Sequence, residues 1–181
     1  MVDSCDDEYL RYVADRSSQL KHLDLGFFQW FDLSVWTEAL KKLSLLEEFS
    51  VYGTDIPSDL VATLASYCPN LKTLKLNNIH SLVKDEMAIA IGESLPKLHH
   101  LELTWSYVSN IGLQAILDGC VHLESLDLRM CCFIDLKGQI GKRCSRQIKC
   151  LQRPNDPINI FHYGERVEYT TMEKFFDFVS T

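Results

Sequence analysis

Leu123-Glu-Ser-Leu126-Asp-Leu128 decides the fold, because its pattern of three spaced leucines returns at a nearly constant distance along the chain. The first residues of successive copies lie 25 to 27 positions apart. The other copies are Leu20-Lys-His-Leu23-Asp-Leu25, Leu46-Glu-Glu-Phe49-Ser-Val51, Leu71-Lys-Thr-Leu74-Lys-Leu76, Leu98-His-His-Leu101-Glu-Leu103 and a worn one, Ile148-Lys-Cys-Leu151-Gln-Arg153. Such regular spacing indicates that the chain repeats one structural unit.

A period of this length with the pattern L-x-x-L-x-L predicts leucine-rich repeats, each made of one strand and one helix. The expected fold is an α/β leucine-rich repeat solenoid, a curved right-handed β-α superhelix with a parallel concave sheet and helices on the convex side. Each repeat buries its apolar residues against its neighbours, since a solenoid has no central core. We assign the repeats to residues 1–153, with five clear strands and a weak sixth.

The segments between the strands carry apolar residues at helical spacing, for example Val35, Trp36, Ala39 and Leu40. Residues 6–19 predict a helix that has no strand of its own, typical of the second half of a repeat. Gly119 follows one helical segment, and we expect it to end that helix.

Residues 154–181 form a separate C-terminal tail, because two prolines in Pro154-Asn-Asp-Pro157 suit neither a helix nor a central strand. Ile158, Ile160, Phe161 and Tyr163 predict a short strand, and the aromatic residues around Phe175 predict a terminal helix. The tail is therefore either a cap over the last repeat or a frayed end.

Composition excludes several classes of protein. The 181 residues carry a net charge of −7, whereas a nucleic-acid surface needs a basic stripe, so we expect no nucleic-acid partner. We also expect no membrane partner, because the sequence has no signal-like segment and no apolar run of roughly 18 residues. The predicted location is intracellular, in the cytoplasm, the nucleus or both.

The cysteines favour a structural use. Cys68, Cys120 and Cys144 stand three or four residues before the first Leu or Ile of three copies of the motif and so share one buried slot in the repeat. The vicinal pair Cys131-Cys132 is expected to hold one buried and one partly exposed thiol. No pair of cysteines or histidines has the spacing of a zinc site, and we predict neither a metal nor a cofactor.

Side chains alternate along a strand, so the residues between the leucines should point out onto the concave sheet. Tyr, Trp and Arg are frequent anchors at protein interfaces, which makes Tyr52, Trp105 and Arg129 the first candidates for contact with a partner. The alternative for Tyr52 and Trp105 is packing against a neighbouring turn. The predicted partner-binding set is Tyr52, Lys75, His100, Glu102, Trp105, Asp127 and Arg129.

Catalysis is not expected. His100 and Ser125 are predicted to be adjacent on the sheet, but no nucleophile elbow, glycine-rich loop or carboxylate pair accompanies them. The sequence predicts a non-enzymatic module that binds a protein on its concave face.

The stretch Ala115-Ile-Leu-Asp-Gly-Cys-Val-His-Leu-Glu-Ser-Leu-Asp-Leu-Arg-Met-Cys-Cys, followed by Gly141-Lys-Arg-Cys-Ser and Arg153-Pro-Asn-Asp, resembles the C-terminal repeats of plant F-box/LRR-repeat proteins. So does Cys68-Pro-Asn-Leu-Lys-Thr-Leu-Lys-Leu. This resemblance implies a substrate-recognition subunit of an SCF-type ubiquitin ligase, which acts in protein degradation and docks on a Skp-type adaptor through an F-box.

The 19 residues before Leu20 are too few for an F-box and already form a repeat helix, so we expect no F-box here and no direct docking on the adaptor. Two alternatives stay open. The concave face could serve as a hormone-type receptor for a small molecule, or the chain could be an inactive truncated remnant.

Overall fold

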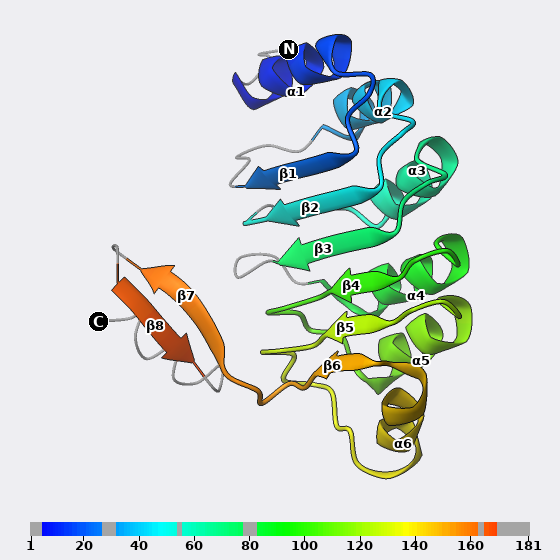
Figure 1. Ribbon diagram of the computed structural model, residues 1–181, viewed down its shortest axis with the longest axis vertical. Coiled ribbons are helices and arrows are strands. Elements are labelled where there is room, and N and C mark those ends of the chain that lie inside the picture. Colours follow the sequence, from blue (N-terminus) through cyan, green and yellow to red (C-terminus); the bar gives the residue numbers. More distant parts are fainter. Residues whose placement is uncertain (1–4, 27–31, 54–55, 78–82, 163–164, 170–181) are drawn as a thin grey trace.

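The computed structural model describes residues 5–26, 32–53, 56–77, 83–162 and 165–169, with side chains from residue 7 to residue 158 of these ranges. Helices and strands alternate along the chain and form two layers, with the strands on one side and the helices on the other (Figure 1). The repeat elements are α1 (Cys5–Arg16), β1 (His22–Gly26), α2 (Leu33–Lys42), β2 (Glu48–Tyr52), α3 (Asp59–Tyr67), β3 (Thr73–Asn77), α4 (Asp85–Ser94), β4 (His100–Glu102), α5 (Asn110–Gly119), β5 (Ser125–Asp127), α6 (Gly138–Gln147) and β6 (Cys150–Gln152).

The six strands β1 to β6 form one open parallel sheet in the order of the sequence. Each strand pairs with the next at the same repeat position, so that Leu74 lies beside Leu101 and Leu101 beside Leu126. The predicted leucine-rich repeat solenoid is therefore confirmed. The strand predicted as weak is present as β6, which pairs with β5 over three residues.

The leucines of the motif form the core between the sheet and the helices. In the copy at residues 123–128, Leu123, Leu126 and Leu128 are at most 2% exposed. Residues of the helices pack against them in one continuous apolar cluster that runs through all the repeats. Because this cluster is shared between neighbouring turns, each repeat depends on the next for its burial.

Helices α4 and α5 approach each other backbone to backbone. A Cβ atom placed on Gly92 would lie 2.3 Å from the carbonyl oxygen of Ala115, and one on Gly119 would lie 1.8 Å from that of Gly92. Gly119 is the last residue of α5 and is not among the glycines with positive φ. The expectation that the helix ends at this glycine is confirmed, and the missing Cβ atom also lets the two helices touch.

A carboxylate also joins these two helices. Asp85, the first residue of α4, accepts hydrogen bonds from the backbone nitrogen of Ser109 at 2.7 Å, from its hydroxyl at 2.6 Å and from the backbone nitrogen of Gly112 at 3.2 Å. Ser109 is itself the N-cap of α5, accepting from the backbone nitrogen of Ile111 at 3.1 Å. Asp85 thus satisfies N–H groups at the start of a helix in the next repeat.

Charged residues that directly precede the strands form a row along one edge of the sheet, which we call the rim row. Glu47 lies between Lys21 at 2.9 Å and Lys72 at 3.2 Å. Glu124 lies 3.0 Å from Lys149 and 4.0 Å from His99. Each acid therefore faces a basic residue in both neighbouring repeats.

The predicted cysteine slot is confirmed, because Cys68, Cys120 and Cys144 are all free and buried. Cys68 lies 3.8 Å from the carbonyl oxygen of Leu43, and Cys120 lies 3.5 Å from that of Leu95. Burial raises the pKa of both thiols to about 11, so they are protonated at neutral pH. The structure also confirms one buried and one exposed thiol in the vicinal pair, Cys131 and Cys132.

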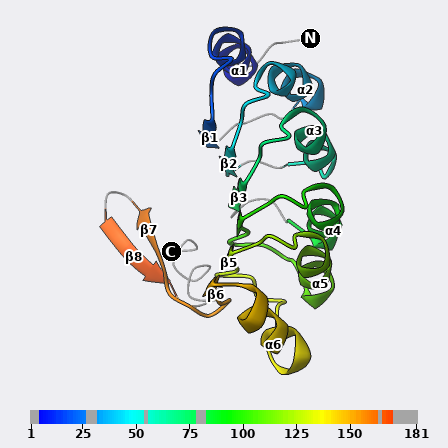
Figure 2. The same ribbon diagram turned by 45° about the vertical axis from the view of Figure 1, so that its right-hand side comes forward.

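The tail forms an antiparallel hairpin of β7 (Ile158–His162) and β8 (Glu165–Tyr169), a sheet separate from that of the repeats. It lies on the side of the main sheet opposite the helices (Figures 1 and 2). β7 corresponds to the strand that the sequence predicts, whereas β8 was not foreseen. The predicted terminal helix around Phe175 lies outside the described residues, and a capping role of the tail stays a prediction.

Candidate functional site

The outward side chains of the sheet form three columns, because equivalent positions of the parallel strands lie side by side. In β1, Leu23 and Leu25 are buried, whereas His22 and Asp24 are exposed, as the alternation of side chains along a strand predicts. The first column is His22, Glu48, Thr73, His100, Ser125 and Cys150; the second is Asp24, Ser50, Lys75, Glu102, Asp127 and Gln152; the third contains Gly26, Tyr52 and Asn77, followed by Thr104 and Arg129 just beyond β4 and β5. Ser50 and Thr104 are only 2% exposed.

A hollow of about 450 Å³ lies over the middle and C-terminal strands of this face. Its lining includes five residues of the predicted partner-binding set, namely Lys75, His100, Glu102, Asp127 and Arg129. The other lining residues are Glu48, Thr73, Leu101, Ser125 and Gln152. The structure therefore brings most of the predicted set together in one open, polar depression.

Two ion pairs hold the charged side chains of the hollow in place, one between neighbouring strands and one within a single repeat. Lys75 donates to Glu48 at 2.5 Å, and these contacts lower the pKa of the carboxyl and raise that of the ammonium. Arg129 binds Asp127 through Nε at 3.0 Å and Nη2 at 2.5 Å, and it also donates to the carbonyl oxygen of Pro157 at 3.3 Å. Hydrogen bonding to Asp127 raises the pKa of Arg129, so both cations stay charged.

Glu102 has a different environment from the other carboxylates. It is half-buried, and its Oε1 accepts a hydrogen bond from Nδ2 of Asn77 at 2.8 Å. Burial, followed by the charge of Asp127, raises its pKa, while the bond from Asn77 and the more distant Lys75 act in the opposite direction. The charged form of Glu102 therefore costs folding free energy at neutral pH.

We expect Glu102→Gln to stabilise the fold at pH 7. Because the folded chain holds the proton of Glu102 more tightly than the unfolded chain, stability is lost as the pH rises through the raised pKa. Below the ordinary value of 4.5 the wild-type carboxyl is protonated in both states, and the advantage of glutamine should disappear. Thermal unfolding of both proteins from pH 4 to pH 8 measures the difference, with Glu93→Gln on the exposed side of α4 as control.

Tyr52 is held in place by two contacts with β1. Its ring packs on Gly26, where a Cβ atom would lie 2.6 Å from the ring carbons, and its hydroxyl donates to Asp24. This hydrogen bond, together with burial, raises the pKa of Tyr52 to about 12. The ring is half-buried at the border of the concave face, outside the hollow.

Trp105 does not lie on the accessible surface, which corrects its place in the predicted set. Its side chain is only 5% exposed, and its backbone has φ of 63° just beyond the short strand β4. Met130 occupies the equivalent place after β5, with φ of 66° and 2% exposure. Trp105 packs against its neighbours, as the alternative interpretation expected. Almost none of its side-chain surface is accessible to a partner.

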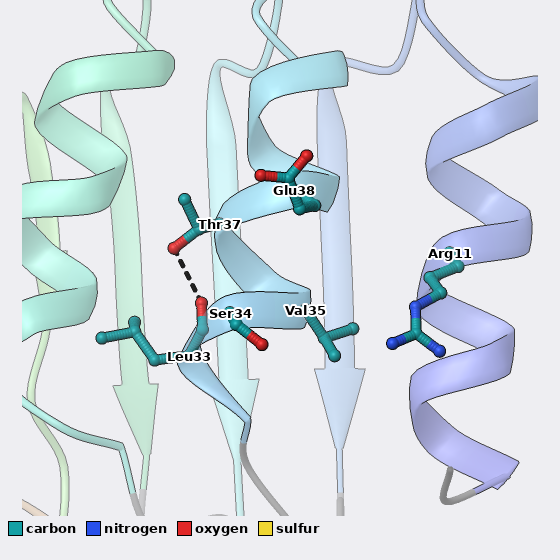
Figure 3. A pocket seen from close by; sticks show the side chains of 6 residues that line it. All are labelled: Arg11, Leu33, Ser34, Val35, Thr37 and Glu38. Atoms are coloured by element: carbon teal, nitrogen blue, oxygen red, sulfur yellow. Dashed lines mark hydrogen bonds between the residues drawn. The ribbon is translucent and has the colours of Figure 1, made fainter. Parts of the chain in front are cut away.

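A second hollow, of about 440 Å³, lies on the helical side at the N-terminal end of the solenoid (Figure 3). Arg11 reaches from α1 toward α2, which supplies the remaining lining residues. The hydroxyl of Thr37 donates a hydrogen bond to the carbonyl oxygen of Leu33 at 2.7 Å, and Glu38 forms an ion pair with Lys41 at 2.6 Å. This hollow leaves no signal in the sequence, because it depends on how two helices from different repeats are spaced.

In the described part of the chain, no three His, Cys, Asp or Glu side chains are grouped so that they could hold a metal ion. Among the described helices, none is long and apolar enough to cross a membrane.

The stacked turns and their polar concave face define a leucine-rich repeat protein. Among known proteins, F-box/LRR-repeat protein 22 of Arabidopsis thaliana is 42% identical over 156 residues, which cover 85% of this chain and 50% of the relative. F-box/LRR-repeat protein 21 of the same plant is 42% identical over 176 residues, covering 87% and 57%, and F-box protein SKIP19 is 39% identical over 157 residues, covering 87% and 52%.

No family model matches the chain. The identity to these relatives nevertheless extends over most of its length, and the repeats of this chain belong to the plant F-box/LRR-repeat family. The chain spans about half the length of the relatives that it matches.

Proposed function

We propose that this chain is a non-enzymatic protein-binding module that recognises a target protein on its concave face. By relationship to the F-box/LRR-repeat proteins, we further propose that this recognition selects substrates for an SCF-type ubiquitin ligase in the cytoplasm or the nucleus. The proposal concerns the repeats alone, among them α1 packed against α2, and docking on a Skp-type adaptor is not part of it.

The observation that carries the proposal is the hollow on the concave face, where strands from five repeats place polar side chains around one depression. Ion pairs fix Glu48, Lys75, Asp127 and Arg129 before a partner arrives. Such preorganisation reduces the entropy that side chains lose on binding. We therefore include Lys75, His100, Glu102, Asp127 and Arg129 in the proposed contact surface, with Tyr52 at its border and Trp105 left out.

The alternative of a small-molecule receptor has no specific observation in its favour. Acidic hormones and phosphorylated cofactors would meet three carboxylates in the hollow, those of Glu48, Glu102 and Asp127, against two cations that are already paired. A protein surface with mixed polar groups fits this lining better, because charge complementarity across an interface governs the choice of partner.

The experiment compares two double variants in affinity capture from a plant extract, with quantitative mass spectrometry as the readout. Lys75→Ala with His100→Ala removes two side chains from the hollow, and Lys97→Ala with Asn70→Ala makes the same change in net charge at exposed turns away from it. We expect target proteins to be captured at least about tenfold less by the hollow variant, the usual cost of losing an interface anchor.

The turn variant should capture the same proteins as the wild type, and thermal unfolding should show that both variants fold. A set of captured proteins that is unchanged by the hollow variant would refute the concave face as the target site. Failure of the wild-type chain to capture any protein in a saturable manner would favour the inactive remnant.

A further inference from the structure

The basic residues of this acidic chain are concentrated at its last repeat. Six of the 18 Lys and Arg residues lie within residues 137–153, and none of the 25 Asp and Glu residues does. The segment covers α6 and β6, which stand at the C-terminal end of the solenoid (Figure 1). Residues 137–153 are therefore positively charged, although the net charge of the whole chain is −7.

Two of these six cations are used within the fold. Arg143 pairs with Asp118 at 2.5 Å and donates to the carbonyl oxygen of Leu117 at 2.8 Å, which fastens α6 to α5. Lys149 pairs with Glu124 in the rim row at 3.0 Å. The other four, Lys137, Lys142, Arg146 and Arg153, are exposed, and none of them forms an ion pair with another described residue.

Three of these four cations surround a hollow of about 520 Å³, which lies between α6 and the end of β6. Lys142 and Arg146 stand one turn apart on α6, and Arg153 follows β6 directly. Leu136 and Leu151, which pack on the core and remain partly exposed, supply apolar surface to the same hollow. A hollow lined by both apolar side chains and cations is typical of a site for an amphipathic anionic ligand.

We propose that this surface, which we call the basic end, binds an acidic peptide segment of a partner protein, with an apolar side chain on Leu136 and Leu151 and carboxylates on the three cations. Arginine suits this task because its planar guanidinium can hold a carboxylate through two parallel hydrogen bonds. A carboxylate partner would also relieve the mutual repulsion of like charges gathered at one site.

A peptide fits these features better than a nucleic acid. Nucleic-acid surfaces present a continuous basic stripe that follows the phosphate backbone. Here three cations and two leucines line a single hollow, and the concave face carries Glu102 and Asp127. The basic end is distinct from the concave hollow, so the inference does not depend on the proposed function.

The test uses the whole chain and four labelled probes in fluorescence anisotropy. The probes are a short peptide of Asp and Glu with a central Leu, the same peptide with Asn and Gln in place of the acids, the acidic peptide with a central Ser, and a single-stranded oligonucleotide. Lys142→Glu with Arg146→Glu reverses the basic end. Lys84→Glu with Lys97→Glu, both exposed near α4, makes the same change in net charge elsewhere.

The acidic peptide with leucine should bind the wild type, with an affinity that falls as salt is added. We expect about a tenfold or greater loss in the basic-end variant and less than about a twofold loss in the control variant, since charge reversal at an interface rim removes attraction and adds repulsion. The serine peptide should bind more weakly, and backbone amide signals of residues 136–153 should shift during an NMR titration.

Several results would overturn the proposal. Equal losses in the two variants would mean that the probe follows overall charge only, and equal binding of the uncharged peptide would mean that carboxylates are not recognised. Tighter binding of the oligonucleotide than of every peptide would assign the surface to nucleic acid. Absence of binding by the wild-type chain, with an unfolding curve that shows it to be folded, would exclude an acidic peptide as the ligand.

Discussion

Gly92→Ala is expected to destabilise the chain by about 2–3 kcal/mol, although alanine is the better helix former. On helix propensity alone the change would stabilise α4 by up to about 1 kcal/mol. The added methyl group, however, would lie 2.3 Å from the carbonyl oxygen of Ala115, and the backbone of α5 cannot rotate away as a side chain could. Overpacking therefore outweighs propensity, and the midpoint of thermal unfolding should fall by roughly 5–10 °C.

The matched control is Glu93→Ala, the next residue of the same helix, whose side chain is exposed. This variant should stay within about 0.5 kcal/mol of the wild type. Gly119→Ala should behave like Gly92→Ala, because its methyl group would meet the backbone of Gly92. A Gly92→Ala protein as stable as the wild type would show that α4 and α5 can move apart without loss.

Asp85→Ala is expected to cost about 2–3 kcal/mol, measured by chemical denaturation. The substitution removes one carboxylate that accepts three hydrogen bonds and leaves the backbone nitrogens of Ser109 and Gly112 without this acceptor. It also removes a negative charge from the N-terminus of α5, where the helix dipole favours an anion. The cost is larger than that of an ordinary cap, because the bonds join two repeats.

Asp85→Asn separates these contributions. An amide oxygen can still accept from both backbone nitrogens, so this variant should lose about half as much stability as the alanine variant. Glu86→Ala, at the exposed neighbouring position, should change little. Equal stability of Asp85→Ala and the wild type would mean that water replaces the carboxylate at no cost.

The sheet could be predicted from the sequence because one physical rule fixes it. Leucines at i, i+3 and i+5 place the last two on the same face of a strand, and equal spacing between copies aligns those faces across parallel strands. The columns of outward residues follow directly, including the meeting of Lys75, Glu102 and Asp127. Five of the seven predicted contact residues therefore line one hollow.

Trp105 was placed in the contact set by its residue type and not by alternation along a strand. It lies beyond β4, which ends at Glu102, in a turn where its backbone has a positive φ and its side chain is buried. A non-glycine residue in this conformation leaves no signal in the sequence. Gly119 shows a related limit. The end of the helix at this glycine could be predicted from the sequence, whereas its close approach to the backbone of Gly92 could not, because that approach depends on how α4 and α5 pack.

The rim row favours particular neighbours for each repeat. Glu47, which precedes the second strand, pairs with a lysine in both neighbouring repeats, and Glu124 faces Lys149 on one side and His99 on the other. Each exposed pair adds little stability, roughly 0–1 kcal/mol. Loss of the second repeat would nevertheless place Lys21 beside Lys72, whereas loss of the fourth would place Lys72 beside Glu124. The repeats are therefore similar in shape but not interchangeable. A variant with a deleted or moved repeat keeps the ion pairs of the rim row only if each acidic residue still lies beside a basic one.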